Sequence, residues 1–222
     1  MAFLQSIRAK AIAFSLIVSI FVLIFAGLGI RSIRRITSST NRAYANALAV
    51  RECVTQAGTA LQEGIRIGYE APMDVTDPER FDELRTYESR LKQTMLDFDM
   101  YTKAITWGSE SEVFGRISGG LVKATWQRHG LAGRLVVAQV PPDVQQLASR
   151  TSLYYAGFSN NALESLQSYR RALRLQTAGQ QAEATAELQK VVASRQKAQH
   201  FSHLIEESFG QIREEVGRYP VR

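Results

Sequence analysis

Cysteine is almost absent from this sequence. Cys53 is the only one among 222 residues, so no disulfide can form within the chain. Cys53 adjoins Val54, which lies on the apolar stripe of a predicted helix, and no histidine is near it in the sequence. We therefore predict a small, packed hydrophobic side chain rather than a nucleophile.

The motifs of catalysis and cofactor binding are also missing. The sequence has no P-loop, no dinucleotide-binding glycine motif, no nucleophile elbow, no paired-histidine zinc motif and no paired-cysteine motif. We therefore predict no catalytic residue, no cofactor and no enzymatic activity.

One metal-binding candidate remains, on the last predicted helix. His200, His203 and Glu207 follow one another at i, i+3 and i+7, which would place three ligands on one helix face. Helices carry such triples by chance, and no matching ligands stand out elsewhere. We therefore favour solvent-exposed helix residues over a metal site.

Charged residues are missing from positions 11–30, AIAFSLIVSIFVLIFAGLGI, which lie between Lys10 and Arg31. At about 1.5 Å per residue a helix of this length spans roughly 30 Å, the thickness of the bilayer hydrocarbon core. Such a helix satisfies its own backbone hydrogen bonds, as lipid requires. The sequence therefore predicts a transmembrane helix at 11–30 after a short tail at 1–10.

A cleaved signal peptide is the alternative, because Arg8 and Lys10 resemble its basic first region. Signal peptides usually have a shorter apolar region that ends in a small-x-small cleavage site, which Gly27 and Gly29 match poorly. We favour an uncleaved anchor.

The net charge of +6 is mild, and removing Arg8 and Lys10 leaves +4. Basic residues are scattered among acidic ones, whereas a nucleic-acid surface would show them clustered, so we predict no nucleic-acid partner. Lys10, Arg31, Arg34 and Arg35 are expected to mark the membrane boundary, where the arginines would meet lipid phosphates. The two sides of the predicted transmembrane helix carry nearly equal numbers of basic residues, so their count does not determine how the helix is oriented in the membrane.

Proline is absent from residues 1–71, and apolar or small residues recur at spacings of three and four after the apolar run. This pattern predicts one continuous helix to about Tyr69, whose stripe packs against neighbouring helices with a left-handed crossing. The stripe consists of Ile33, Ile36, Thr40, Ala43, Ala47, Val50, Val54, Ala57, Leu61, Gly64 and Gly68.

A second helix is predicted after Pro72, with Pro78 in its first turn, because neither proline can lie in the interior of a regular helix. Thr76 or Asp77 can cap its beginning, and it ends near Gly108. Its apolar stripe consists of Leu84, Leu91, Phe98 and Ile105.

The stretch 109–143 has no long periodic pattern. Ser109 and Glu112 fit a capping box that opens a short helix, and Gly119-Gly120 interrupts it. Residues 135–140 are apolar, but no second strand is available to pair with them. We therefore predict a helix or an extended loop there rather than a strand.

The third helix is predicted to begin at Asp143 and to bend or change register near Gly157, where the phase of its apolar residues shifts. Gly179 fits the position just after a helix C-terminus, and a fourth helix runs out at Gly217.

The predicted fold is therefore all-α. The transmembrane helix continues into an antiparallel four-helix bundle at 31–217, with an irregular region of short helices between helices two and three and a tail at 218–222.

The junction between the third and fourth predicted helices resembles the leucine-glycine-alanine turn of bacterial chemoreceptor sensor domains. Its residues are Leu173, Leu175, Gly179, Ala182, Ala184, Ala186 and Leu188. With the anchor and the helix that leaves it, roughly residues 5–216 resemble the sensing half of chemoreceptors and related transmembrane sensors. The resemblance implies an extracytoplasmic four-helix bundle, or two stacked bundles.

Receptors of that family also have a second membrane helix, a linker module and a signalling domain, which do not occur in these residues. We expect either a shortened receptor or a bundle reused as a docking module. Our first hypothesis is a non-catalytic, single-pass protein of the bacterial inner (cytoplasmic) membrane with its bulk in the periplasm. Its bundle would dock on other subunits of a respiratory, photosynthetic or secretion complex, or on a second copy, as an accessory or stabilising subunit.

The candidate interface residues are Trp107, Trp126, Tyr154 and Tyr155, although aromatic residues more often close the end of a bundle. The second hypothesis is a sensor domain that binds a small organic acid or amino acid between helices. The third, a metal-dependent activity, rests on His200, His203 and Glu207 alone.

Overall fold

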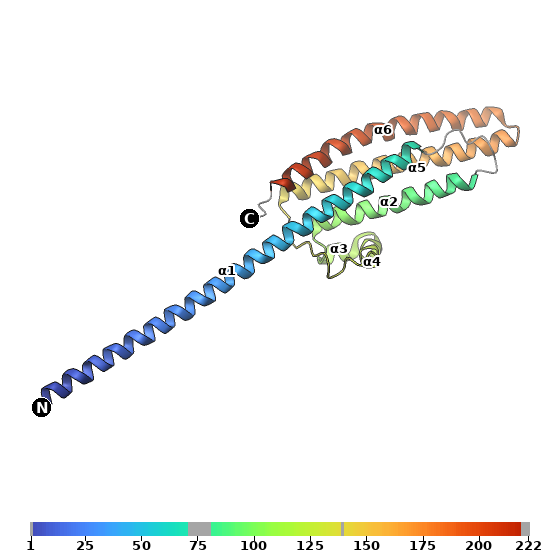
Figure 1. The fold of residues 1–222 in the computed structure, drawn as a ribbon. Coiled ribbons are helices and arrows are strands. Elements are labelled where there is room, and N and C mark those ends of the chain that lie inside the picture. Colours follow the sequence, from blue (N-terminus) through green and yellow to red (C-terminus); the bar gives the residue numbers. More distant parts are fainter. Residues whose placement is uncertain (1, 71–80, 139, 219–222) are drawn as a thin grey trace. The chain divides into compact units, whose positions relative to one another are not determined.

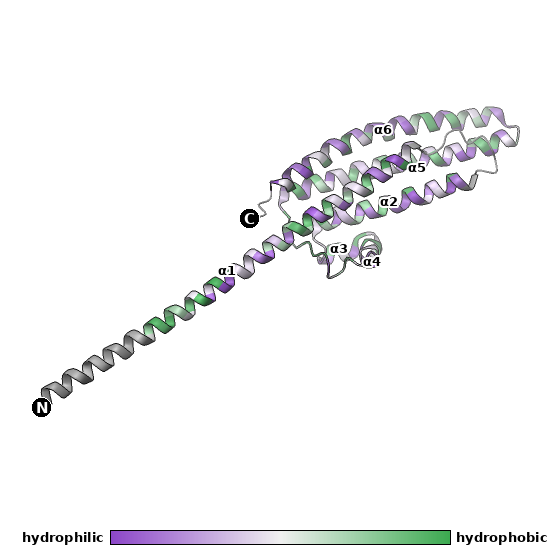
Figure 2. Ribbon diagram, viewed as in Figure 1, coloured by the Kyte–Doolittle hydropathy of each residue, from purple (hydrophilic) through white to green (hydrophobic). Residues whose placement is uncertain are grey.

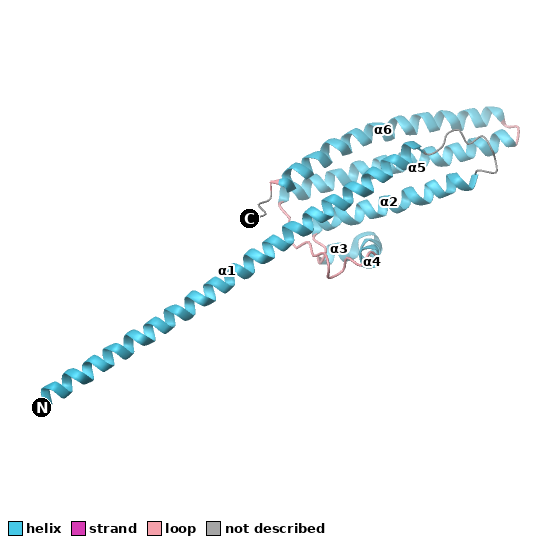
Figure 3. Ribbon diagram, viewed as in Figure 1, coloured by secondary structure: helices cyan, strands magenta, loops and turns pink. Residues whose placement is uncertain are grey.

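The computed structural model describes residues 2–70, 81–138 and 140–218, with the side chains of residues 2–20, 70, 81 and 82 left aside. Within these ranges the regular structure is entirely helical and contains no strand, as Figure 3 shows. The all-α prediction is confirmed to this extent. The elements are α1 (Ala2–Glu70), α2 (Phe81–Trp107), α3 (Glu112–Arg116), the 3-10 helix η2 (Ile117–Gly120), α4 (Leu121–Arg128), α5 (Pro142–Thr177) and α6 (Gln181–Gly217).

The chain divides into two units, Met1–Ala45 and Asn46–Arg222. In the first unit the described residues all belong to α1. Residues 21–30 carry no charge and are all exposed, and Figure 2 shows them as a hydrophobic stretch of this helix.

Among the described residues, no helix combines the length and the apolar character needed to cross a membrane. The predicted span at 11–30 is only half included in that statement, because the side chains of residues 11–20 lie outside the description. The transmembrane helix therefore stays a prediction.

In the second unit, α5 packs extensively on α6 and also on α2, and Figure 1 shows the three helices side by side. Thr151 meets Ser208 near one end of the α5–α6 pair and Arg171 meets Glu187 near the other, so these helices run antiparallel. Tyr69 of α1 contacts both the Ser202 hydroxyl at 2.9 Å and the Phe158 ring. These contacts make the packing bundle-like.

The apolar stripes predicted from the sequence form the core of this unit. On α2, all four stripe residues are buried: Leu84, Leu91, Phe98 and Ile105. On α1, the stripe is buried from Ala47 to Gly64. Burial of these side chains provides the main driving force for the packing, at roughly 25 cal/mol per Å² of apolar surface.

The first part of the α1 stripe differs from the prediction. Ile33 and Ile36 are exposed, at 65% and 66%, and so are Thr40 and Ala43. The heptad spacing nevertheless continues without change through these positions. Periodicity therefore predicted the helix correctly and its burial only from Ala47 onward.

The start of α3 corrects the predicted capping box. Ser111, not Ser109, is the N-cap, and its hydroxyl accepts a hydrogen bond from the Phe114 amide at 3.0 Å. The Ser109 hydroxyl instead accepts from the amide of Val137 at 3.0 Å. A contact with a residue 28 positions away thus replaces the local one that the sequence suggested. Gly119 and Gly120 do interrupt the short helices, with φ of +64° and +88°.

Residues 135–138 and 140 form a loop, as predicted. The predicted N-terminal cap of the second helix, Thr76 or Asp77, lies outside the described residues.

Helix α5 continues through Gly157, and the change of register predicted there is wrong. Its buried positions, from Val144 to Leu173, repeat at three and four residues with no change of phase. The apparent phase shift arose because several of these positions hold alanine, serine or threonine, which an apolar pattern overlooks. Gly157 allows the Phe201 ring of α6 to approach closely: a Cβ at this position would lie 2.6 Å from it.

The turn from α5 to α6 matches the prediction at Gly179, which has a φ of +77°. The amide of Gly179 donates to the Gln176 carbonyl, and that of Gln180 donates to the Leu175 carbonyl. This double pairing satisfies the last carbonyls of the helix and favours glycine at the left-handed position.

Candidate functional site

A groove of about 590 Å³ opens between α2 and α5, with Leu121 of α4 at its side. We refer to it as the α2–α5 groove. Its apolar wall is formed by Met95, Leu96, Leu121, Ala156 and Leu163, and Tyr155 also lines it. Its polar lining consists of Ser89, Lys92, Gln93, Asp99 and Ser152. A mainly apolar concavity with a few polar groups has the character and volume of small-molecule sites.

Two polar links tie α2 to α5 at different heights along the groove. Ser152 donates a hydrogen bond of 3.0 Å to Asp99, and Lys103 lies 3.7 Å from the same carboxylate. The second link is the Glu88 carboxylate of α2, which accepts hydrogen bonds from Gln167 and Arg170 of α5. Because Glu88 and Asp99 are eleven positions apart on one helix, the two links are separated by roughly 16 Å.

Glu88 is the most heavily bonded acid in the described part of α2. It accepts hydrogen bonds from Lys92 at 2.8 Å, Gln167 at 3.2 Å and Arg170 at 3.3 Å. The bond from Lys92 is the largest cause that lowers the pKa of Glu88, with Gln167 and Arg170 adding to it against the opposing effect of burial. Glu88 is therefore held in its charged form by three donors.

Tyr155 supports the groove from the core. Its ring lies 4.1 Å from that of Phe98, centroid to centroid, and the side chain is 2% exposed. Burial raises the pKa of Tyr155 to about 12, while the nearby Thr94 and Ser159 hydroxyls act in the opposite direction. Within the described residues no group meets the hydroxyl with hydrogen-bond geometry.

The four candidate interface aromatics occupy different environments. Trp126 and Tyr155 are core residues, and Trp126 packs edge-on against Phe114. Tyr154 is half-buried, and Trp107 is 50% exposed at the end of α2. Of the four, Trp107 presents the most surface to a partner.

The metal-binding candidates are all on the surface of α6. His200, His203 and Glu207 are exposed, and the part of the chain with described side chains holds no group of three or more His, Cys, Asp or Glu placed to bind a metal ion. Cys53 is fully buried, and burial, with a smaller effect of Glu52, raises the pKa of its thiol to about 12. It is packed as predicted and poorly placed to act as a nucleophile.

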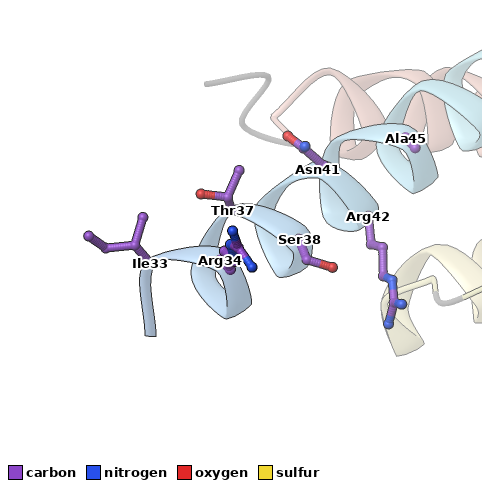
Figure 4. A pocket seen from close by; sticks show the side chains of 7 residues that line it. All are labelled: Ile33, Arg34, Thr37, Ser38, Asn41, Arg42 and Ala45. Carbon is purple, nitrogen blue, oxygen red and sulfur yellow. The ribbon is translucent and has the colours of Figure 1, made fainter. Parts of the chain in front are cut away.

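The predicted boundary residues Arg31, Arg34 and Arg35 are exposed on α1, while the side chain of Lys10 lies outside the description. A shallow, open pocket of about 540 Å³ lies on this helix, and Figure 4 shows the seven side chains that line it. Arg34, Thr37, Ser38, Asn41 and Arg42 supply its polar groups, and Ile33 and Ala45 its apolar ones.

Charge is distributed unevenly between the two units. Residues 1–45 contain six basic residues and no acidic one, whereas residues 46–222 contain 21 of each. The whole net charge of +6 therefore belongs to the first unit.

No protein family, curated protein or solved structure matches this chain. Among the residues that line the α2–α5 groove, Tyr155 was identified from the sequence, as a candidate interface aromatic, and the others were not proposed as site residues. Glu88 and Lys92 form an i,i+4 pair on α2, a signal that usually means no more than a solvated helix face. What gives them a role is their position opposite Gln167 and Arg170, 79 and 82 residues away.

Proposed function

We propose that this chain is a non-catalytic, single-pass membrane protein whose antiparallel four-helix bundle docks on other proteins as an accessory or stabilising subunit of a membrane complex. The observation that carries this proposal is the stretch 21–30 of α1, where every residue is exposed and uncharged. Seven of these residues are large and hydrophobic: Phe21, Val22, Leu23, Ile24, Phe25, Leu28 and Ile30. A soluble protein rarely leaves so continuous an apolar surface in water.

The sequence around this stretch supports the same interpretation. The apolar run extends back to residue 11 and is followed by Arg31, Arg34, Arg35 and Arg42 with no acidic residue among them. Basic side chains next to an apolar helix interact favourably with anionic lipid headgroups. By its resemblance to sensor domains, we place the bundle on the periplasmic side of a bacterial inner membrane.

Docking on a partner is supported by the exposed Trp107. Tryptophan is enriched among the residues that dominate protein interfaces, because its large ring is rigid and partly polar. Trp107 lies at the end of α2, next to α3 with its exposed Val113. These residues are the proposed contact with the partner.

Membrane attachment can be tested by fractionation of the full chain expressed in a bacterium. Replacing both Ile24 and Leu28 by Asp should move the protein from the carbonate-washed membrane fraction to the supernatant, because each buried charge costs about 2.5–3.5 kcal/mol in a membrane helix. Ser38→Asp with Asn41→Asp adds the same charge at exposed positions outside the run and should leave the protein in the membrane. A wild-type chain that stays in the supernatant would refute the anchor.

Docking can be tested separately with a photo-crosslinking amino acid. Placed at Trp107, it should join the chain to one defined larger partner in gentle-detergent membranes, whereas placement at the exposed His203 should not. A monomer, or the same products from both positions, contradicts the docking role. A C-terminal alkaline phosphatase fusion reports the side of the membrane, and inactivity of that fusion contradicts the periplasmic placement.

A further inference from the structure

The α2–α5 groove has an apolar wall between two charged groups of opposite sign. The lining residues come from α2, α4 and α5, so all of them belong to the unit 46–222. Neither residues 21–30 nor Trp107 line the groove, so a ligand bound there depends on neither the proposed membrane attachment nor the proposed docking.

The apolar wall fits a hydrocarbon chain. Met95 and Leu96 face the groove from α2, and Ala156 and Leu163 face it from α5. The methionine side chain is flexible and adapts its shape to a bound chain. Lys92 and Asp99 both line the groove and are seven positions apart on α2, a rise of roughly 10 Å, which suits an extended ligand of about eight carbons.

Lys92 provides a cationic group at one end. Its ammonium group is 2.8 Å from Glu88, but Glu88 also accepts hydrogen bonds from Gln167 and Arg170. Lys92 can therefore turn toward a ligand carboxylate while Glu88 keeps two of its three donors. A lysine that can be released without leaving its partner unpaired is well suited to bind an anion.

Asp99 gives the other end the opposite sign. Its carboxylate accepts from Ser152 and lies near Lys103, and it lines the groove. A second negative charge on the ligand at this end would be repelled. The arrangement therefore selects a molecule with one carboxylate and an uncharged tail.

We propose that the α2–α5 groove binds an amphipathic monocarboxylate, with its aliphatic chain on Met95, Leu96, Ala156 and Leu163 and its carboxylate on Lys92. The proposed ligand class excludes dicarboxylates, which carry a second negative charge, and amines, which carry a positive head group.

The first test compares three water-soluble probes by isothermal titration with the full chain in amphipol. Octanoate should bind saturably with one site. Suberate, which adds a carboxylate at the far end, and octylammonium, which reverses the charge of the head, should each bind at least about ten-fold more weakly. Hexanoate should bind up to about fifteen-fold more weakly, because each methylene lost removes roughly four-fold in affinity. Equal or tighter binding of suberate or octylammonium, or no saturable binding of octanoate, overturns the proposal.

The second test places the ligand in the groove. Lys92→Gln should weaken octanoate binding by at least about five-fold, because it removes the positive charge, whereas Lys190→Gln should not. Lys190 is a matched control, because it is equally exposed and pairs with Glu187 at i,i+3 on α6, away from the groove. Equal weakening by the two substitutions overturns the assignment of the carboxylate to Lys92.

A bulky residue should block the groove directly. Ala156→Trp should abolish saturable octanoate binding, because Ala156 lines the groove. Ala193→Trp makes the same change at an exposed position of α6, away from the groove, and should leave binding intact. Circular dichroism confirms that each variant is folded. Binding that survives Ala156→Trp, or that is lost equally in Ala193→Trp, overturns the proposal.

Discussion

Helix α5 packs against α6 and α2 in two different ways. Toward α6 it presents several small and hydroxyl-bearing residues besides Arg171, among them Gly157 and Thr151, whose hydroxyl lies 2.7 Å from that of Ser208. Toward α2 it presents Tyr155 against Phe98 and the longer polar side chains Gln167 and Arg170. The contact with α6 is the more extensive of the two.

The difference shows how side-chain size decides where a helical bundle stays open. Helices with small residues at their contact approach closely, and the separation of two helices grows with the side chains between them. Where α5 faces α6, Gly157 has no side chain, and the Phe201 ring occupies the space beside it. Where α5 faces α2, the contact is less extensive, two polar links join the helices, and the α2–α5 groove lies between them. Three predictions test this contrast.

The largest effect is expected from the aromatic contact on the α2 side. Phe98 is fully buried between Tyr155 and Phe209, with ring centroids 4.1 and 6.3 Å away. Phe98→Ala should lower the free energy of unfolding by about 3–5 kcal/mol, because it removes apolar contacts and leaves a cavity. Denaturant unfolding followed by circular dichroism in mild detergent measures this loss.

Phe25→Ala is the matched control for that substitution. Phe25 is 68% exposed, so the same change of side chain should shift the free energy of unfolding by less than about 0.5 kcal/mol. Similar losses in the two variants would mean that Phe98 has no special place in the core.

The second prediction concerns the close contact on the α6 side. Gly157→Ala should destabilise by about 1–3 kcal/mol, because the new methyl group would lie 2.6 Å from the Phe201 ring. Gly210→Ala on α6 should have the opposite sign and stabilise by about 0.5–1 kcal/mol, since nothing lies within 4 Å and alanine is the better helix former. Unfolding free energies of both variants provide the measurement.

A second substitution identifies the cause. Phe201→Leu in the Gly157→Ala background should recover part of the stability, because the smaller side chain makes room for the methyl group. If Gly157→Ala and Gly210→Ala shift the free energy of unfolding in the same direction, α5 and α6 do not approach each other closely at Gly157.

Gly157 also shows where prediction from the sequence succeeded and where it failed. The helices and several of their ends followed from apolar spacing, proline and glycine: α2 ends at Trp107 beside Gly108, and α5 ends two residues before Gly179. The change of register expected near Gly157 was wrong because Ser152, Ser159 and Ser165 occupy buried positions of α5. Serine is usually counted as polar, so an intact heptad pattern looked interrupted.

The prediction of the N-cap of α3 was wrong for a different reason. By local rules Ser109 is the better cap, because Glu112 completes a capping box with it, but in the structure the Ser109 hydroxyl is bonded to Val137 and Ser111 caps the helix. The α2–α5 groove could not be predicted for the same reason, because it depends on contacts between residues far apart in the sequence. Lys92 and Asp99 look like ordinary surface residues until Leu163 and Ser152, more than fifty residues later, are placed opposite them. Local patterns specify helices, whereas the choice between equivalent residues depends on tertiary contacts.

The smallest effect is expected from the polar link on the α2 side, where Glu88 joins Lys92 to Gln167 and Arg170. The pKa of Glu88 is lowered in the folded protein, first by the hydrogen bond from Lys92, from an ordinary value of 4.5. A lowered pKa means that the charged form adds stability above about pH 4.5 and that this contribution is lost as the pH falls through the folded value. Glu88→Gln should therefore cost about 1 kcal/mol or less at about pH 6, and the difference from wild type should shrink toward about pH 3.

Unfolding free energies measured between about pH 3 and pH 6 test this dependence. Glu112→Gln is the control, because Glu112 pairs with Arg116 at a highly exposed position of the short helix α3 and should contribute little at any pH in this range. A Glu88→Gln penalty that stays constant or grows as the pH falls would mean that the carboxylate charge does not stabilise the α2–α5 contact. The release of Lys92 to a bound carboxylate would then also lose its physical basis, because Glu88 would not be held by its remaining donors.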